Sequence, residues 1–223
     1  MSFFDIHHIF FSLWGYTVSY LEFGGIISGA IAVWLSARGN IWSWPIGLIN
    51  VSLLFFLFFQ VQLYPDMFLQ VFFFVTNIMG WWRWGHPAQS EADKKQELKV
   101  SYIPAKQLFI FSLAGLVGTL IFGNFASHLH ELVPIIFSKP SAFPYIDSFV
   151  TVMSIVATYL MVQKKVECWA VWILVDVIAT AMYFVKEIKF LSAEYLVFCF
   201  LAAYGLRTWI KENRSYKMHQ STL

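Results

Sequence analysis

The sequence predicts an all-α integral membrane protein of about seven transmembrane helices, arranged as two parallel three-helix repeats joined by a linker helix. Three observations support this fold class. First, 59% of the 223 residues are hydrophobic and 13% are charged, whereas a soluble domain usually carries about 25% charged residues. Second, apolar runs of about 20 residues, each sufficient to cross a bilayer, follow one another along the chain. Third, the two halves of the chain resemble each other.

The apolar runs place the helices in order. At about 20 residues for each crossing, we expect helices at 21–37, 41–59, 66–84, 107–123, 146–163, 167–185 and 191–210. The segment from Gly123 to Pro144 contains three prolines and is expected to be a loop, with a short helix inside it as the alternative. We expect a single membrane domain, made of the first three-helix repeat (21–84), the linker helix (107–123), the second repeat (146–210) and a cytoplasmic tail (211–223).

Residues 1–20 are expected to form an N-terminal interfacial segment. This segment has no basic start and no clear small-residue cleavage site, so it does not resemble a removable signal peptide. His7 and His8 precede Phe10, Phe11 and Trp14, and this mixture of polar and aromatic residues predicts a short helix in the membrane interface. The sequence leaves open whether the segment contains an extra span.

The internal repeat has clear landmarks. A shift of 125 residues without a gap places Glu22 on Asp147, Trp44 on Trp169, Gly80 on Gly205 and Trp84 on Trp209. Three helices plus one linker helix make an even number, so both halves enter the membrane in the same direction. Transporters with parallel repeats hold their solute where the repeats meet. The two equivalent acids begin helices, where the helix dipole favours negative charge, so we expect them to act as caps.

Lysine and arginine are distributed unevenly between the two ends of the expected helices. With the helix order above, 12 of the 15 Lys and Arg residues fall on one side. Because cytoplasmic loops carry the excess of positive charge, this side should be cytoplasmic. The N-terminus should therefore lie outside and the C-terminus inside.

Several function classes are excluded by the composition and by missing motifs. A net charge of +2 without a basic patch gives no reason to expect a nucleic-acid partner. Cys168 and Cys199 lie in apolar runs and lack metal-ligand spacing, so neither a disulfide framework nor a zinc site is expected. No P-loop, Rossmann fingerprint or nucleophile elbow occurs. We therefore expect no enzyme activity, no cofactor and no metal.

The sixth expected helix carries an acid near its centre. Trp169, Trp172, Asp176, Thr180 and Tyr183 follow one another at steps of three or four residues, which places them on one helix face. A carboxylate at bilayer depth is costly and rarely faces lipid. With aromatic rings around it, such a carboxylate is expected to form a binding position for a cationic or aromatic solute. The alternative is an Asp176 that pairs with a neighbouring helix to fix packing.

Amide side chains fall at a similar depth. Asn50 and Asn77 lie near the centres of the second and third expected helices; Gln70 shares the Asn77 face, and Trp44 faces inward if the repeat holds. Such amides either join helices, for about 0.6 kcal/mol each, or contact a solute. Asn50, Asn77 and Asp176 fall at one depth, which favours a solute site, whereas Gln70 lies a turn or two off centre. The candidate substrate-binding residues are Asp176, Trp169, Trp172, Asn50, Asn77, Gln70, Tyr183 and Trp44.

The chain resembles a known family over about residues 20–210. The runs WPIGLINVSLLFFLFFQVQLYPDMFLQVFFFVTNIMGWWRW and KKVECWAVWILVDVIATAMYF, with their LYPD, GWWRW and W-x-x-W-x-x-x-D motifs, are similar to the PnuC transporters of bacteria. This resemblance implies a 3+1+3 fold like that of SWEET transporters. It also implies a homotrimer in the bacterial inner membrane that takes up nicotinamide riboside by facilitated diffusion, and a cytoplasmic kinase that traps the riboside by phosphorylation.

The candidate residues suit this implied substrate. The nicotinamide ring is flat and cationic, so the indoles and Tyr183 can offer it π faces, and Asp176 can balance its charge. The amides can bond its carboxamide or its ribose hydroxyls. Another vitamin, such as riboflavin or thiamine, or a sugar on the same scaffold remains an alternative, as does proton coupling through Asp176. An intramembrane enzyme or a structural protein is disfavoured by the repeat.

Overall fold

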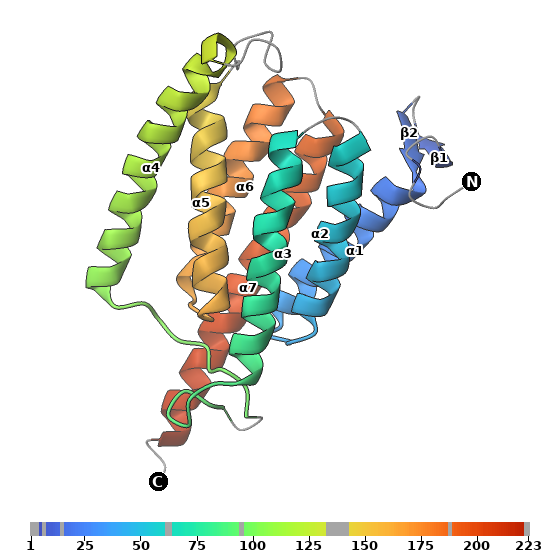
Figure 1. Cartoon of the computed structure of the whole chain (residues 1–223). Coiled ribbons are helices and arrows are strands. Elements are labelled where there is room, and N and C mark those ends of the chain that lie inside the picture. Colours follow the sequence, from blue (N-terminus) through green and yellow to red (C-terminus); the bar gives the residue numbers. More distant parts are fainter. Residues whose placement is uncertain are drawn as a thin grey trace. The chain divides into compact units, whose positions relative to one another are not determined.

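The computed structural model describes residues 5, 8–13, 16–60, 64–93, 96–132, 143–186 and 189–220. These residues form a two-stranded hairpin followed by seven helices (Figure 1). The elements are β1 (Ile9–Leu13), β2 (Tyr16–Ser19), α1 (Tyr20–Ala37), α2 (Ser43–Gln60), α3 (Tyr64–Gly85), α4 (Ala105–Leu132), α5 (Pro144–Val162), α6 (Glu167–Val185) and α7 (Lys189–Gln220). The helices that the apolar runs predict are thus all present.

Two helices run further than expected. α4 does not end at Gly123 but continues to Leu132, so the expectation of a loop from Gly123 onward is wrong for that part. Gly123 is used for packing, because the ring of Tyr145 in α5 occupies the space that a Cβ would fill. α7 continues through the expected tail to Gln220, where the Tyr216 hydroxyl donates to Glu212 Oε1 one turn earlier, at 2.6 Å. Residues 133–142 lie outside the described part of the chain.

The N-terminal segment is not helical where it is described. β1 and β2 pair antiparallel, with Phe11 opposite Val18, so the expectation of a short helix is wrong, while His7 and Trp14 lie outside the described residues. Ser19 ends β2 and caps α1: its backbone N–H donates to Glu22 Oε2 at 2.8 Å, and its hydroxyl accepts from the Glu22 N–H at 3.1 Å. This reciprocal capping box confirms the capping role expected of Glu22.

The chain divides into two compact units, residues 1–99 (unit 1) and residues 100–223 (unit 2). In unit 1, α2 packs against both α1 and α3, and the hairpin contacts α1. In unit 2, α5 packs against α4 and α6, and α6 packs against α7. The helix expected to link the repeats, α4, therefore belongs to the second unit.

Five of the described helices are long and apolar enough to cross a membrane, namely α1, α2, α4, α5 and α6. α3 has 22 residues, but Gln70, Asn77 and its cluster of tryptophans lower its mean hydropathy. The 32-residue α7 ends in a charged stretch. The structure is an all-α membrane protein, as the composition predicts.

The internal repeat is visible in the packing of tryptophan on glycine. In unit 1 the Trp44 ring meets Trp84 edge-on, with centroids 5.2 Å apart at 88°, and in unit 2 Trp169 meets Trp209 at 5.4 Å and 86°. Each first tryptophan also lies against a glycine of the third helix. A Cβ on Gly80 would collide with the Trp44 ring, and a Cβ on Gly205 would lie 2.6 Å from Trp169 Cε2.

The repeat extends to the turn between the first two helices of each half. Gly39 and Lys164, which are 125 positions apart, both adopt a left-handed backbone, with φ of 64° and 52°. The next residue in each turn donates back to the end of the preceding helix, Asn40 N to Leu35 O at 3.0 Å and Lys165 N to Leu160 O at 2.9 Å. These bonds close both helices with the same type of C-terminal cap, so the two halves fold alike locally.

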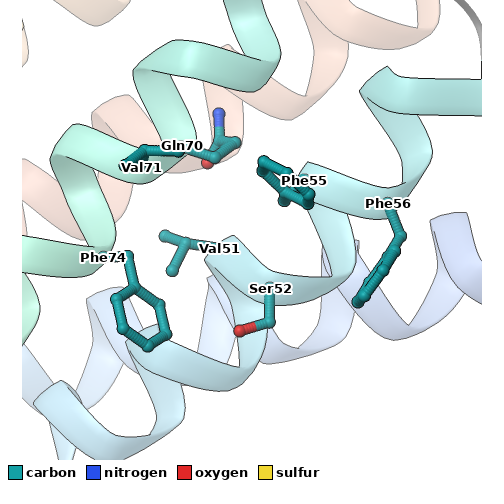
Figure 2. A pocket seen from close by; sticks show the side chains of 7 residues that line it. All are labelled: Val51, Ser52, Phe55, Phe56, Gln70, Val71 and Phe74. Atoms are coloured by element: carbon teal, nitrogen blue, oxygen red, sulfur yellow. The ribbon is translucent and has the colours of Figure 1, made fainter.

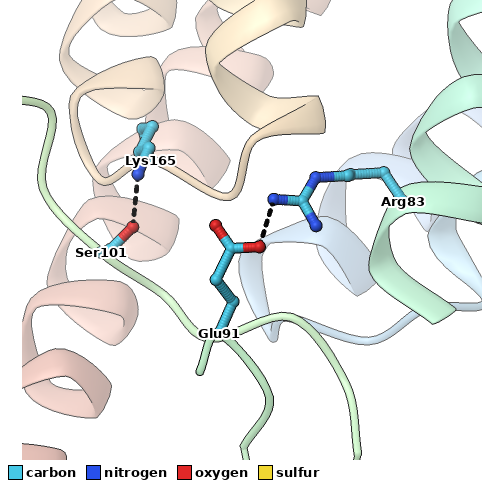
Figure 3. A network of polar contacts seen from close by, with 4 residues as sticks. All are labelled: Arg83, Glu91, Ser101 and Lys165. Carbon is cyan, nitrogen blue, oxygen red and sulfur yellow. Dashed lines mark hydrogen bonds and ion pairs between the residues drawn. The ribbon is translucent and has the colours of Figure 1, made fainter. Parts of the chain in front are cut away.

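Polar contacts hold the segment that follows α3 and the segment that precedes α4 (Figure 3). In unit 1, Arg83 at the end of α3 forms an ion pair with Glu91 at 2.8 Å. In unit 2, Lys165 Nζ donates to Ser101 Oγ at 2.7 Å, and the backbone N–H of Ile103 donates to the Glu167 carboxylate at 3.1 and 3.2 Å. The segment that leads into α4 is thus held on the α5–α6 turn, which explains why α4 belongs to unit 2.

We predict that Gly80→Ala and Gly205→Ala each lower the thermal stability of the detergent-purified protein. The new methyl group must displace a buried tryptophan, and such overpacking costs about 1–3 kcal/mol, which outweighs the gain of about 1 kcal/mol in helix propensity. Gly85→Ala is the matched control, because its Cβ would only touch the tip of Ile41 at 3.4 Å. If Gly80→Ala and Gly205→Ala melt at the same temperature as Gly85→Ala, the tryptophan–glycine contacts do not stabilise the two units.

Candidate functional site

Asp176 is the most unusual polar residue of unit 2. It lies in the middle of α6 and is 3% exposed. Among the described residues, no hydrogen-bond donor or cation lies against its carboxylate, and the Thr180 hydroxyl donates to the Asp176 backbone oxygen instead, at 2.7 Å. A buried, unpaired carboxylate is unfavourable by several kcal/mol or more. The expected alternative, an acid that fixes packing by pairing with a neighbouring helix, finds no partner among these residues.

Two side chains accompany this carboxylate. Trp172 lies one turn before Asp176, and its indole Nε1 is buried without a hydrogen-bond acceptor in the described structure. Cys199 of α7 lies within the range of electrostatic interaction with Asp176. From the sequence Cys199 is expected only to be a buried thiol, because the register of α6 against α7, which brings it near Asp176, cannot be obtained from either helix alone.

Trp169 and Trp44 occupy interior positions in their own units. They are 1% and 4% exposed, and each is enclosed by the glycine and tryptophan contacts of its repeat. Their indole Nε1 atoms are buried and have no acceptor among the described residues. In this conformation neither ring offers an open π face, so their main contribution here is to packing.

Tyr183 lies apart from Asp176, near the other end of the α6 face. Seven residues along a helix separate the two by about 10 Å. Its ring stacks on Tyr195 of α7 at 5.3 Å and 17°, and Lys186 Nζ lies 5.7 Å from the ring centroid. Lys186 also forms an ion pair with Asp147 at 2.9 Å, so this acid at the start of α5 joins two helices. The structure therefore separates Tyr183 from the acidic position.

The two asparagines of unit 1 make contacts between and within helices. Asn50 Nδ2 donates to the Gly25 carbonyl of α1 at 2.7 Å, which ties α2 to α1. Asn77 Nδ2 donates to Phe73 O at 2.8 Å, and its Oδ1 lies directly against the backbone of Gly47. The Asn50 nitrogen thus joins two helices and the Asn77 nitrogen bonds within α3, while no described donor bonds the Asn50 Oδ1 atom.

A cavity of about 250 Å³ opens between α2 and α3 within unit 1 (Figure 2). Gln70, 7% exposed, lies at its wall, with aromatic rings around it. Its lining residues are Val51, Ser52, Phe55, Phe56, Gln70, Val71 and Phe74. The cavity is smaller than the usual small-molecule pocket of roughly 300–1,000 Å³. Phe56, Val71 and Phe74 on its wall are each more than 40% exposed, so it is an open groove rather than an enclosed pocket.

This cavity and the acidic position correspond to each other under the repeat. A shift of 125 residues carries Val51 onto Asp176, and Phe74 onto Cys199. The same location on the two units is therefore apolar with a nearby amide in unit 1, and acidic in unit 2. Within the described parts of the chain no cluster of three His, Cys, Asp or Glu residues could hold a metal ion.

Comparison with known proteins identifies the family. A family model described as nicotinamide mononucleotide transporter matches residues 19–211. The nicotinamide riboside transporter PnuC of Escherichia coli strain K12 is 35% identical over 234 residues, which cover 96% of each chain. PnuC of Neisseria mucosa is 28% identical over 86% of this chain and 73% of its own.

Two further relatives extend the comparison. The riboflavin/roseoflavin transporter RibM of Streptomyces davaonensis is 26% identical over 92% of this chain and 91% of its own. The crystal structure of the vitamin B3 transporter PnuC superposes with a TM-score of 0.68 and 26% identity, over 88% of this chain and 83% of the other. Both the sequence and the fold lead to the same conclusion: this chain belongs to the nicotinamide mononucleotide transporter family, the family of the PnuC proteins.

Proposed function

We propose that the chain carries nicotinamide riboside across the bacterial inner membrane by facilitated diffusion. The observation that carries this proposal is the buried, unpaired carboxylate of Asp176, in a chain similar to proteins named nicotinamide riboside transporters. A carboxylate kept without a partner is stabilised when a cationic solute binds beside it. The pyridinium ring of the riboside supplies such a cation.

The acidic position accounts for recognition of the ring. Asp176 balances the ring's positive charge, and the Trp172 indole contributes a π surface one turn away. A cation–π contact of this kind stabilises a bound ligand by about 0.5–2 kcal/mol. The buried Trp172 Nε1, which has no acceptor in the described structure, can donate to an oxygen of the bound solute.

The remaining candidate residues bind the rest of the molecule or support the site. Gln70, the Asn50 oxygen and Asn77 bond the carboxamide or the ribose hydroxyls, since amides both donate and accept. Trp44 and Trp169 each bring an unpaired indole N–H. Tyr183 adds an aromatic surface at the far end of α6.

The same acid favours the riboside over related solutes. A phosphate adds about −1.5 to −2 charges at neutral pH, so a buried Asp176 repels the mononucleotide that the family description names. Riboflavin, the solute in the name of RibM, has a neutral ring system and gains nothing from a buried carboxylate. Phosphorylation by a cytoplasmic riboside kinase would therefore prevent the product from leaving, so net uptake needs no ion gradient.

The proposed topology and assembly have support from the sequence and the family resemblance. Positive charge concentrated at one end of the helices supports an outside N-terminus and a cytoplasmic C-terminus. The resemblance to the PnuC transporters supports a homotrimer in the lipid bilayer.

We predict that Asp176→Asn weakens binding of nicotinamide riboside at least tenfold, and that Trp172→Ala does the same. An opposite charge about 4 Å away stabilises a ligand by up to about 4 kcal/mol near a protein surface, so losing part of this interaction exceeds a tenfold effect. Isothermal calorimetry on the purified variants measures it. Trp42→Ala, which removes an exposed indole of unit 1, should bind like the parent. Normal affinity in both site variants would remove Asp176 and Trp172 from the site.

We also predict that Gly47→Ala weakens riboside binding, because the added methyl group would occupy the space of the Asn77 oxygen and turn this amide away. Gly25→Ala is the control: its methyl group would meet only the end of the Leu54 side chain, at 3.2 Å. Calorimetry at matched folded fractions separates affinity from stability. If both alanine variants bind equally well, Asn77 is a packing residue only.

For the mode of transport, we predict that proteoliposomes take up labelled riboside only until the internal and external concentrations are equal. An imposed proton gradient should not change this end point, while an enclosed kinase with ATP should drive continued uptake. Protein-free liposomes provide the background. Accumulation above the external concentration with the gradient alone would establish proton coupling and contradict facilitated diffusion.

A further inference from the structure

The N-terminal hairpin presents aromatic residues beside the first transmembrane helix. Phe10 lies 4.7 Å from both Tyr20 and Phe23, and Phe11 lies 5.9 Å from Phe23, measured between ring centroids. The hairpin is therefore attached to the first turn of α1 by a cluster of rings. Even so, Ile9, Phe10 and Phe11 remain 51%, 43% and 37% exposed.

The exposed rings continue a stripe along α1. Ile27, Ile31 and Trp34 are each exposed by more than 40% and follow one another at steps of four and three residues. Phe23, which contacts both hairpin rings, lies one turn before Ile27 on the same face. This face points away from α2, because α1 meets α2 through Gly25 and Gly29 on its opposite side.

The length of α1 fixes the depth of the hairpin. Its 18 residues span about 27 Å at about 1.5 Å per residue, and the hydrocarbon core of a bilayer is about 30 Å thick. A membrane-spanning α1 thus uses its whole length in the core, and the segment directly before it lies at the headgroup layer. The other end of α1 carries an interface pair as well, with Arg38 over the Trp34 ring at 4.8 Å.

We propose that this hairpin is a membrane-interface anchor, which inserts Ile9, Phe10 and Phe11 into the headgroup layer and continues the lipid-facing stripe of α1. Interfacial segments bury apolar side chains, Phe among them, about 5–10 Å into the boundary between headgroups and acyl chains. The exposed pair Ser12–Thr17 follows the Phe11–Val18 pair, so it points to the hairpin face opposite Phe11. The capping box between Ser19 and Glu22 holds the anchor at a fixed angle to α1.

Spin labels test the anchor in the full-length protein reconstituted into phosphatidylcholine–phosphatidylglycerol vesicles. The parent carries Cys199→Ala, and the fully buried Cys168 should not react, as labelling of this parent checks. Labels at Phe11→Cys and Thr17→Cys are compared for collisions with oxygen, which enters the bilayer, and with a nickel chelate, which stays in water. Ile9→Cys replaces Phe11→Cys if that variant folds poorly.

The anchor predicts that the label at position 11 collides with oxygen and loses access to nickel, while the label at position 17 keeps access to nickel. Equal nickel access at both positions would place the hairpin in water and overturn the proposal. Low access to both reagents at position 11 would show that protein, for example a second copy of the chain, covers this surface, and would also overturn it.

Discussion

A buried carboxylate in the middle of α6, with no partner among the described residues, is the physical constraint on which the proposed function rests. Burial of Asp176 without a donor or cation from the described residues is unfavourable for the folded state. Such a group lowers stability unless a proton or a cation neutralises it. The proposed binding of a cationic solute beside Asp176 would give this burial a functional reason.

The helix packing around this acid in unit 2 has an equivalent in unit 1. Each unit places a tryptophan at the start of its second helix and encloses it with a glycine and a tryptophan of its third helix. The turn before that tryptophan has the same left-handed residue and the same capping bonds in both units. On this common framework the polar groups differ: Val51 and Gln70 border a cavity in unit 1, where unit 2 has Asp176 and Tyr195 at the equivalent positions. The two units thus share a framework but carry different side chains at these equivalent positions.

The sequence predicted the helices and the repeat well, because both depend on local composition and on spacing. The predictions from the sequence are wrong where residues from another element of the chain decide the local structure. α4 continues past Gly123 because Tyr145 of another helix fills the space beside the glycine. The N-terminal segment pairs as strands rather than coiling into a helix, since its aromatic residues find Tyr20 and Phe23 to pack against. Neither partner is visible in a local pattern.

The candidate site was predicted less completely than the fold. Helical spacing placed Trp172 beside Asp176, but the same spacing could not show that Trp169 is enclosed by Gly205 and Trp209. Nor could it show that the Asn50 nitrogen serves α1 while its oxygen stays available. Cys199 comes close to Asp176 only through the register of two helices. Spacing identifies a shared face, whereas tertiary packing decides which members of that face remain open.

The central claim is that the buried acid recognises the positive charge of the solute. Reduced nicotinamide riboside has nearly the same shape as the oxidised compound but carries no charge on its ring, so calorimetry of both ligands with the unmodified protein measures the contribution of that charge at Asp176 and Trp172 together. The account predicts that the oxidised riboside binds at least tenfold more tightly than the reduced one, a difference of about 1.4 kcal/mol or more. Equal affinity for the two compounds would contradict it.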